Sequence, residues 1–181
     1  MKQTSFIRAF IANPKNTGSI TPSSRYLIEE MIKYIDRDHT VVELGAGNGC
    51  ITRSIIKKGC QTLYTYENNL NLRHELKQSG ILQKKHIKTN AFDIDTLHLS
   101  NSIDIVVSSL PLVNFSYEER NTLIFKINHI LKFTGKFIMF SYKFDFPVQY
   151  EDIKKIGFTI VQKKIVWLNF PPAMVFILQK K

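Results

Sequence analysis

The sequence has few of the residues that hold metals or cross-links, and it has no long apolar run. It contains two cysteines, Cys50 and Cys60, without the spacing of a metal site or a disulfide framework. The five histidines show no metal-ligand spacing either, so we expect no metal and reduced thiols. The most apolar stretch, 165–178, is interrupted by Asn169 and two prolines and is shorter than the ~20 residues of a spanning helix. We therefore expect no membrane span. We also expect no signal peptide, because the N-terminus has no unbroken apolar region and no small-residue cleavage site.

Acidic residues are scarce relative to basic ones. The chain has 25 Lys and Arg against 15 Asp and Glu, a formal net charge of +10. Such an excess favours an anionic partner, either nucleic acid or the cytoplasmic face of a membrane. The lysines occur as scattered pairs, however, and a solvated surface explains these equally well. The length of 181 residues and the 44% apolar content suit a single domain, and no internal repeat is present.

A glycine-rich segment organises the chain. Residues 43–49 read Glu-Leu-Gly-Ala-Gly-Asn-Gly, after an apolar run at 40–42 and before apolar residues at helical spacing. This pattern predicts a strand, a turn and a helix, in which glycines allow close approach of a ligand and free N–H groups add donors. The dinucleotide fingerprint Gly-x-Gly-x-x-Gly is not matched, and an acid at the mouth would repel a pyrophosphate. The segment looks like motif I of class I methyltransferases and favours S-adenosylmethionine. Its expected contacts are Glu43, Gly45, Ala46, Gly47 and Gly49.

The tips of the next two strands supply further candidates for cofactor binding. Glu67 follows the strand predicted at 62–66, where an acidic residue can accept hydrogen bonds from ribose hydroxyls. Asn90 and Phe92 follow the third strand, where they can contact the adenine ring; the alternative for Asn90 is an ordinary Asx turn. The predicted nucleoside contacts are Glu67, Asn68, Asn90, Ala91 and Phe92.

Strands and helices are expected to alternate along the whole chain. Strands are predicted at 40–42, 62–66, 86–89, 103–108, 135–142, 158–168 and 173–179, and helices at 26–32, 51–56, 70–79, 117–131 and 148–156. The short reversal at two prolines predicts a closing hairpin, so the last strand should be antiparallel to its neighbours. The expected fold class is α/β: a Rossmann-like, seven-stranded, mostly parallel sheet with an antiparallel last strand and helices on both faces. This domain would span 23–181.

The tip of the fourth strand, Ser109-Leu110-Pro111-Leu112, is expected beside the reacting methyl group. Ligand chemistry in a parallel sheet lies outside the carboxyl ends of the strands. Proline removes a donor there, so the exposed carbonyls can orient an incoming amine. Tyr142, at the fifth strand tip, either faces the methylated cation with its ring or packs in the core with its hydroxyl at the rim. The candidate catalytic residues are Ser109, Leu110, Pro111 and Tyr142, with Ser109 also a cofactor contact. No side chain stands out as a general base.

Residues 1–22 precede the domain and are predicted to form an amphipathic basic helix and a polar loop. The helix is either a lid packed on the domain or a surface helix whose apolar face enters the lipid headgroup region. The loop leads to the next helix and would lie over the ligand. The expected membrane and substrate contacts are Phe6, Ile7, Arg8, Phe10, Ile11, Ser19, Thr21 and Arg25.

Over nearly its whole length the chain resembles the bacterial phospholipid N-methyltransferases of the small soluble type. The resemblance rests on four segments: 10–14 with 18–25, 43–49, 109–112 and 166–173, which reads Val-Trp-Leu-Asn-Phe-Pro-Pro-Ala. It implies S-adenosylmethionine as donor, S-adenosylhomocysteine as product and phosphatidylethanolamine, methylated towards phosphatidylcholine, as substrate. It also implies a cytoplasmic enzyme bound peripherally to the inner leaflet, with the anionic membrane surface as partner. Such families usually carry Asp where this chain has Asn90.

The outline also resembles the rRNA adenine dimethylases, which carry Asn-x-Pro-Phe/Tyr after the fourth strand. Their asparagine and aromatic residue grip a flipped adenine, whereas this chain has Ser109 and Leu112 at those positions. Methylation of rRNA adenine or of a protein amine is therefore the second hypothesis, and no stable nucleic-acid complex is expected. A donor-binding protein without catalysis is the third hypothesis. The full set of acidic and glycine residues disfavours it.

Overall fold

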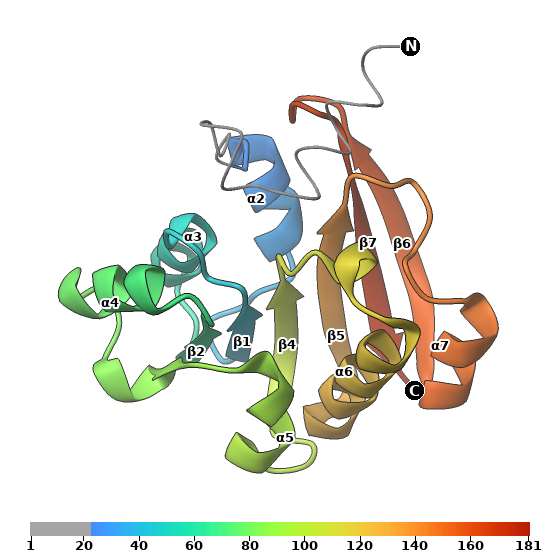
Figure 1. Ribbon diagram of the computed structural model, residues 1–181, viewed down its shortest axis with the longest axis horizontal. Coiled ribbons are helices and arrows are strands. Elements are labelled where there is room, and N and C mark those ends of the chain that lie inside the picture. Colours follow the sequence, from blue (N-terminus) through green and yellow to red (C-terminus); the bar gives the residue numbers. More distant parts are fainter. Residues whose placement is uncertain (1–22) are drawn as a thin grey trace.

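Seven strands form one sheet in the order β3-β2-β1-β4-β5-β7-β6 (Figure 1). In this computed structural model, which describes residues 23–181, the pairings from β3 through β5 are parallel, and β7 is antiparallel to both β5 and β6. The expected mostly parallel sheet with an antiparallel last strand is confirmed. The strands are β1 (Thr40–Leu44), β2 (Thr62–Tyr66), β3 (Ile87–Lys88), β4 (Ile103–Ser108), β5 (Leu131–Ser141), β6 (Phe158–Val166) and β7 (Ala173–Lys180).

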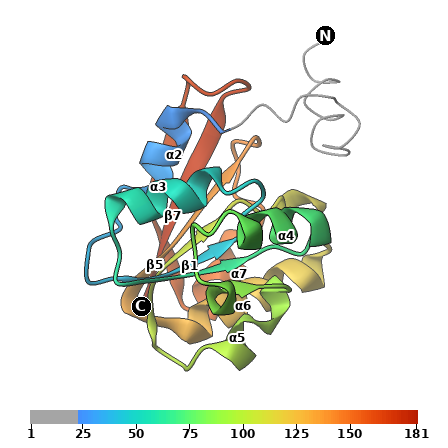
Figure 2. The ribbon, with the colours of Figure 1, turned by 90° about the vertical axis from the view of Figure 1, so that its left-hand side faces the viewer.

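Helices cover both faces of the sheet, as the two views in Figures 1 and 2 show. One apolar core joins the sheet to α2 and α3, and a second joins the other face to α5, α6 and α7. A smaller cluster, built on Leu76 of α4, closes the β3 end. The central strands are apolar on both faces because both faces are covered. The helices are α2 (Arg25–Ile32), α3 (Cys50–Lys58), α4 (Leu70–Gln78), α5 (Ile94–Leu97), α6 (Tyr117–Ile130) and α7 (Tyr150–Ile156).

Local sequence signals explain several of the helix boundaries. The Ser24 hydroxyl caps α2 by accepting from the backbone amide of Leu27, at 3.2 Å. At the start of α6, Ser116 and Glu119 form a reciprocal capping box. Gly157, with φ of 96°, ends α7 in the left-handed conformation that glycine adopts readily.

The fifth strand begins earlier than expected from the sequence. Helix α6 ends at Ile130 and β5 starts at the next residue, whereas the sequence predicted a helix to 131 and a strand from 135. The pairing with β4 shifts register between Ile103 and Ile105, and Thr134 adopts a positive φ of 64° in the irregular stretch. A bulge of this kind adds residues to one strand without a periodicity signal.

None of the helices between residues 23 and 181 combines the length and apolar character that crossing a bilayer requires. In the same range no three His, Cys, Asp or Glu side chains are grouped closely enough to hold a metal ion. Seven of the predicted membrane and substrate contacts lie outside the described residues: Phe6, Ile7, Arg8, Phe10, Ile11, Ser19 and Thr21.

Candidate functional site

The glycine loop joins β1 to α3 at the carboxyl edge of the sheet, as expected. Gly45, Gly47 and Gly49 have φ angles of 81°, 55° and 82°, in the left-handed region that side chains disfavour. The amides of Gly45 and Ala46 both donate to the carbonyl of Tyr66, at 2.8 and 3.1 Å. The loop is therefore folded back over the end of β2 and held there.

One side of this loop is packed and the other is open. A Cβ on Gly45 would come within 3.0 Å of Leu110 Cδ2 and Ser109 Oγ, so the residues after β4 press directly on this glycine. A Cβ on Gly47 would meet nothing within 4 Å. Space for a ligand therefore lies next to the backbone of Gly47.

Glu67, at the tip of β2, is bound to the glycine loop. Its Oε2 accepts from the amide of Gly47 at 2.8 Å, and its Oε1 accepts from the amide of Asn69 at 2.7 Å. The side chain is 9% exposed. Each carboxylate oxygen keeps a further lone pair, so contact with a ribose stays a prediction. The neighbouring Asn68 is exposed, and its carbonyl accepts from Arg73 at 3.1 Å.

Glu43 lies in a different place from the one that the sequence suggested. We expected its carboxylate at the mouth of the loop, but the side chain is 0% exposed and points towards α3, where Oε2 accepts from the Thr52 hydroxyl at 2.6 Å. The other oxygen, Oε1, is buried without a hydrogen-bond partner. Burial raises the pKa of the Glu43 carboxyl to about 7; the Thr52 bond opposes this shift and the charge of Glu67 adds to it.

Thr52 is a functional candidate that sequence reasoning missed. It is fully buried on the inner face of α3, between Ile51 and Ile55, where the helical pattern predicts an apolar residue. A polar residue on an apolar helix face was the only available signal. Its hydroxyl donates to the Glu43 carboxylate and so holds that side chain against α3.

Asn90 forms the Asx turn that the sequence had left as the alternative. Its Oδ1 accepts from the amide of Phe92 at 3.0 Å and caps the 3₁₀ turn η2 (Ala91–Asp93). The Phe92 ring stacks on Phe115, with 5.9 Å between centroids, and the Phe92 carbonyl accepts from Lys126. Asn90 and Phe92 thus have structural contacts of their own, and their contacts with adenine stay predictions.

The residues after β4 are tied to the glycine loop. The Ser109 hydroxyl donates to the carbonyl of Gly45 and approaches that of Leu44 at 3.3 Å. Pro111, with φ −77° and ψ 72°, forms an inverse γ-turn in which the Leu112 amide donates to the Leu110 carbonyl at 2.8 Å. The Pro111 carbonyl accepts from Asn114 at 2.9 Å. These carbonyls are therefore oriented by the turn, and each keeps one lone pair.

Tyr142 follows the last residue of β5 and is partly buried. Its ring lies edge-on to Phe140, with 5.5 Å between centroids, and its hydroxyl is hydrogen-bonded to Asn169. Burial raises the pKa of this hydroxyl, so it stays protonated near neutral pH. The packing alternative is thus present in the structure, and contact of the ring with a cation stays a prediction. Arg25, at the start of α2, forms an exposed ion pair with Glu29, and its guanidinium lies over the Tyr26 ring, 5.5 Å from the centroid.

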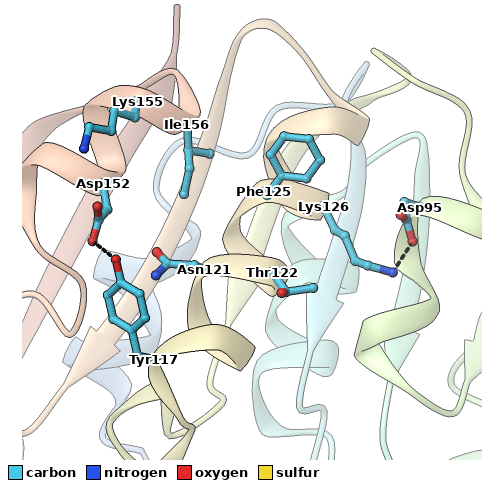
Figure 3. Close-up of a pocket in the computed structure, with 9 residues that line it drawn as sticks. All are labelled: Asp95, Tyr117, Asn121, Thr122, Phe125, Lys126, Asp152, Lys155 and Ile156. Carbon is cyan, nitrogen blue, oxygen red and sulfur yellow. Dashed lines mark hydrogen bonds and ion pairs between the residues drawn. The ribbon is translucent and has the colours of Figure 1, made fainter.

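A separate hollow of about 480 Å³ lies on the helical face, between α5, α6 and α7 (Figure 3). Its walls include two polar contacts, from Tyr117 to Asp152 at 2.8 Å and from Lys126 to Asp95 at 2.9 Å. None of its lining residues belongs to the glycine loop or to a strand tip. The sequence did not indicate this hollow. The lining residues are Asp95, Tyr117, Asn121, Thr122, Phe125, Lys126, Asp152, Lys155 and Ile156.

Comparisons with known proteins identify the family and the fold. A family model described as a methyltransferase domain matches residues 42–139, from β1 to the end of the β5 pairing with β4. No curated protein matches the chain by sequence.

Many solved structures share the fold. A SAM-dependent methyltransferase from Aquifex aeolicus has a TM-score of 0.64 and 13% identity, over 85% of this chain and 89% of that one. One from Methanosarcina mazei has a TM-score of 0.67 and 16% identity, over 83% and 96%. The 1,6-didemethyltoxoflavin-N1-methyltransferase of Burkholderia thailandensis, solved with 1,6-didemethyltoxoflavin and S-adenosylhomocysteine, has a TM-score of 0.69 and 15% identity, over 98% and 86%. At these identities the likeness is one of fold.

Proposed function

This chain belongs to the methyltransferase domain family, and we propose that it transfers a methyl group from S-adenosylmethionine to the amine of a phospholipid headgroup. The predictions of an S-adenosylmethionine-dependent methyltransferase and of its Rossmann-like fold are thereby confirmed. The identity of the acceptor is the proposal. Phosphatidylethanolamine, methylated towards phosphatidylcholine at the membrane surface, is the acceptor that we favour.

The residues of the glycine loop fit such a donor. The backbone of Gly47 borders open space, so an amino-acid moiety can approach it closely. The Glu67 carboxylate places negative charge beside the loop, which suits a cationic ligand, whereas the Glu43 carboxyl, with its pKa raised to about 7, is only partly ionised near neutral pH. The free lone pairs of Glu67 suit ribose hydroxyls. The Glu43 Oε1 atom, buried without a partner, has capacity for a donor group or a water molecule beneath the loop.

The single observation that carries the choice of acceptor is the conformation after β4. A base-methylating site needs an amide and an aromatic ring there. Here the Ser109 hydroxyl is committed to the carbonyl of Gly45, and Leu112 is 1% exposed in the core. Neither side chain is available to grip a base. A small aliphatic amine needs no such grip, because one or two acceptors suffice to orient it.

The residues of this chain then act by positioning. The donor supplies an electrophilic methyl group, so the chain has to align an uncharged amine with it and exclude water. The carbonyls of Leu110 and Pro111 are fixed by the γ-turn and each can accept an amine hydrogen. We propose that the ring of Tyr142, at the tip of the adjacent strand β5, stabilises the methylated ammonium cation.

Labelled S-adenosylmethionine offered with lipid extract, rRNA or total protein tests the proposal. We expect label in the ethanolamine-containing lipids and little in the other two fractions. A Glu67→Ala variant serves as the inactive control for each fraction. Label in rRNA alone, or in protein alone, would replace the lipid acceptor by the corresponding alternative and leave methyl transfer itself intact.

A further inference from the structure

The turn between β6 and β7 carries three large apolar side chains that face solvent. Trp167, Leu168 and Phe170 are 68%, 65% and 69% exposed. Asn169, in their midst, is 3% exposed, so the turn holds its polar side chain inward and its apolar side chains outward. This is the reverse of the usual arrangement of a surface turn. A cluster of exposed aromatic and aliphatic side chains indicates an interaction site.

The turn is held firmly by its inward-facing residue. Asn169 Oδ1 accepts from the backbone amide of Ser24 at 2.9 Å, and its Nδ2 donates to the carbonyl of Pro171 at 2.7 Å. The hydroxyl of Tyr142 is hydrogen-bonded to the same side chain. The turn is thus joined to the start of α2 and to the end of β5. The hydrogen bonds of Asn169 therefore hold the turn in a conformation that leaves its apolar side chains exposed.

The turn lies at the edge of the sheet where the glycine loop lies. Val166 and Ala173 form the last pair of the β6–β7 ladder, and Met174 pairs with Ser141, the last residue of β5. Residues 167–172 therefore extend beyond the carboxyl end of β5, as the upper end of the sheet in Figure 1 shows. Since neighbouring strands are about 4.8 Å apart, β7 is about 10 Å from β4 along the sheet.

The charges of the hairpin select the kind of partner. From Phe158 to Lys181 the only charged residues are four lysines. Lys163 and Lys164 lie in β6, on the side of the turn, and Lys164 pairs with Glu30, whereas Lys180 and Lys181 lie at the opposite end of the hairpin. Arg25 and Lys143, beside the two anchoring points of the turn, are exposed as well. Apolar side chains at a protruding hairpin end, with Arg25, Lys143 and Lys163 as the cations on this side, match the interface of an anionic bilayer, where Trp is enriched and each nearby cation is attracted. Single-stranded nucleic acid can stack bases on Trp167 and Phe170 but leaves the aliphatic Leu168 without an apolar partner, whereas a bilayer accommodates all three side chains.

We propose that the turn 167–172 inserts Trp167, Leu168 and Phe170 into the interface of an anionic lipid bilayer. Insertion places the carboxyl edge of the sheet, with the glycine loop and the β4 tip, against the lipid headgroups. The inference rests on the proposed function for its substrate. It adds a docking element in the C-terminal hairpin, separate in sequence from the predicted N-terminal helix.

The chain offers a direct probe, because Trp167 is its only tryptophan. Its emission should shift to shorter wavelength on addition of phosphatidylglycerol vesicles and should be quenched by lipids brominated in their acyl chains. Phosphatidylcholine vesicles should cause a smaller shift, and added salt should reverse the effect. No shift with phosphatidylglycerol would overturn the proposal. So would a shift caused by rRNA in place of vesicles. Emission already shielded from iodide before vesicles are added would also overturn it, since the turn would then be covered in the free protein.

Variants that keep the probe test the neighbouring side chains. The double change Leu168→Asp and Phe170→Asp should lower sedimentation with phosphatidylglycerol vesicles about tenfold or more, since it removes apolar insertion and adds negative charge. Leu99→Asp is the matched control: Leu99 is 81% exposed and precedes β4, at the opposite edge of the sheet. Equal binding by the two variants would overturn the proposal. If the double Asp variant does not fold, the same changes to Ser replace it.

A water-soluble, short-chain phosphatidylethanolamine separates this inference from the proposed function. Wild type and the double variant should methylate the soluble lipid equally, whereas the variant should be slower on vesicles. Methylation of the soluble lipid without any Trp167 shift on vesicles would overturn the docking element alone. A Trp167 shift without methylation of any lipid would overturn the lipid acceptor and leave the docking element standing.

Discussion

The carboxylate of Glu67 binds the backbone of Gly47, with 2.8 Å between Oε2 and the amide nitrogen. These residues are 20 positions apart and come from adjacent strand tips. The second carboxylate oxygen accepts from Asn69, the cap of α4. Glu67 is the predicted contact of the donor's ribose. It therefore also holds the glycine loop, which is the predicted contact of the donor's amino-acid group. We therefore predict that donor binding and the stability of the loop both depend on Glu67.

Glu67→Gln tests this coupling. An amide has one acceptor oxygen, so one of the two backbone donors loses its partner, at a cost of about 1–3 kcal/mol in the free energy of unfolding. Hydrogen exchange should become faster at the amide of Gly47 or Asn69, and affinity for S-adenosylhomocysteine should fall. Glu75→Gln, on the exposed side of α4, is the control. Unchanged exchange and affinity in the Glu67 variant would contradict the role given to this residue.

Gly47→Ala tests where the ligand lies, with Gly80→Ala as its control. Both glycines have positive φ, 55° and 66°, and at neither would a Cβ meet an atom within 4 Å. Both changes should lower stability by about 1–2 kcal/mol through backbone strain. Only Gly47→Ala should weaken binding of S-adenosylhomocysteine, by about tenfold. Calorimetry and thermal unfolding of the two variants give the comparison; equal affinities would move the ligand away from the open side of the loop.

Glu43 predicts a pH dependence of stability. Its pKa is raised by burial from 4.5 to about 7 in the folded chain, so the folded state holds a proton that the unfolded state releases between these values. The folded state is therefore favoured at low pH, and wild type should lose about 3 kcal/mol relative to Glu43→Gln as the pH rises from about 4.5 to 7. Urea unfolding of both proteins across this range measures the difference. Parallel stability curves would show that Glu43 titrates normally.

Two substitutions of Tyr142 distinguish the role of its ring from that of its hydroxyl. If the ring stabilises the methylated cation, Tyr142→Phe should keep kcat within about twofold, whereas Tyr142→Leu should lower it about tenfold, because a cation–ring contact contributes about 1–2 kcal/mol when desolvated. Both variants lose the hydrogen bond to Asn169, so the pair isolates the ring. Equal kcat in the two variants would restrict Tyr142 to packing.

Most strands and helices could be predicted because apolar periodicity and turn residues within each segment specify them. The bounds of β2 and β4 agree with the sequence at both ends, and the antiparallel last strand follows from the short turn before Ala173. The early start of β5 was missed because a bulge interrupts periodicity between Leu131 and Gly135. Sequence patterns describe regular repeats, and the three extra residues in β5 leave no repeat to detect.

The sequence located the segments that form the candidate site, but it did not predict the hydrogen bonds of their side chains. The glycine loop and Glu67 lie together as expected, whereas Glu43 is buried beneath the loop on the side of Thr52. Strand alternation decides which way a side chain points, and at the last residues of β1 both faces of the sheet are covered. The link between Asn169 and Ser24, 145 residues apart, could not be read from the sequence at all. It depends on tertiary packing.

The central claim is that the loop from Glu43 to Gly49, held by Glu67, binds the methyl donor. Titration calorimetry with S-adenosylhomocysteine, on wild type and on Glu67→Ala, tests it most directly. We predict one binding site per chain in the wild type. Affinity should be about tenfold lower or more in the variant, because it lacks the carboxylate oxygens that accept from the amides of Gly47 and Asn69. Absence of binding heat in a folded wild-type protein, or the same affinity in both proteins, would contradict the account.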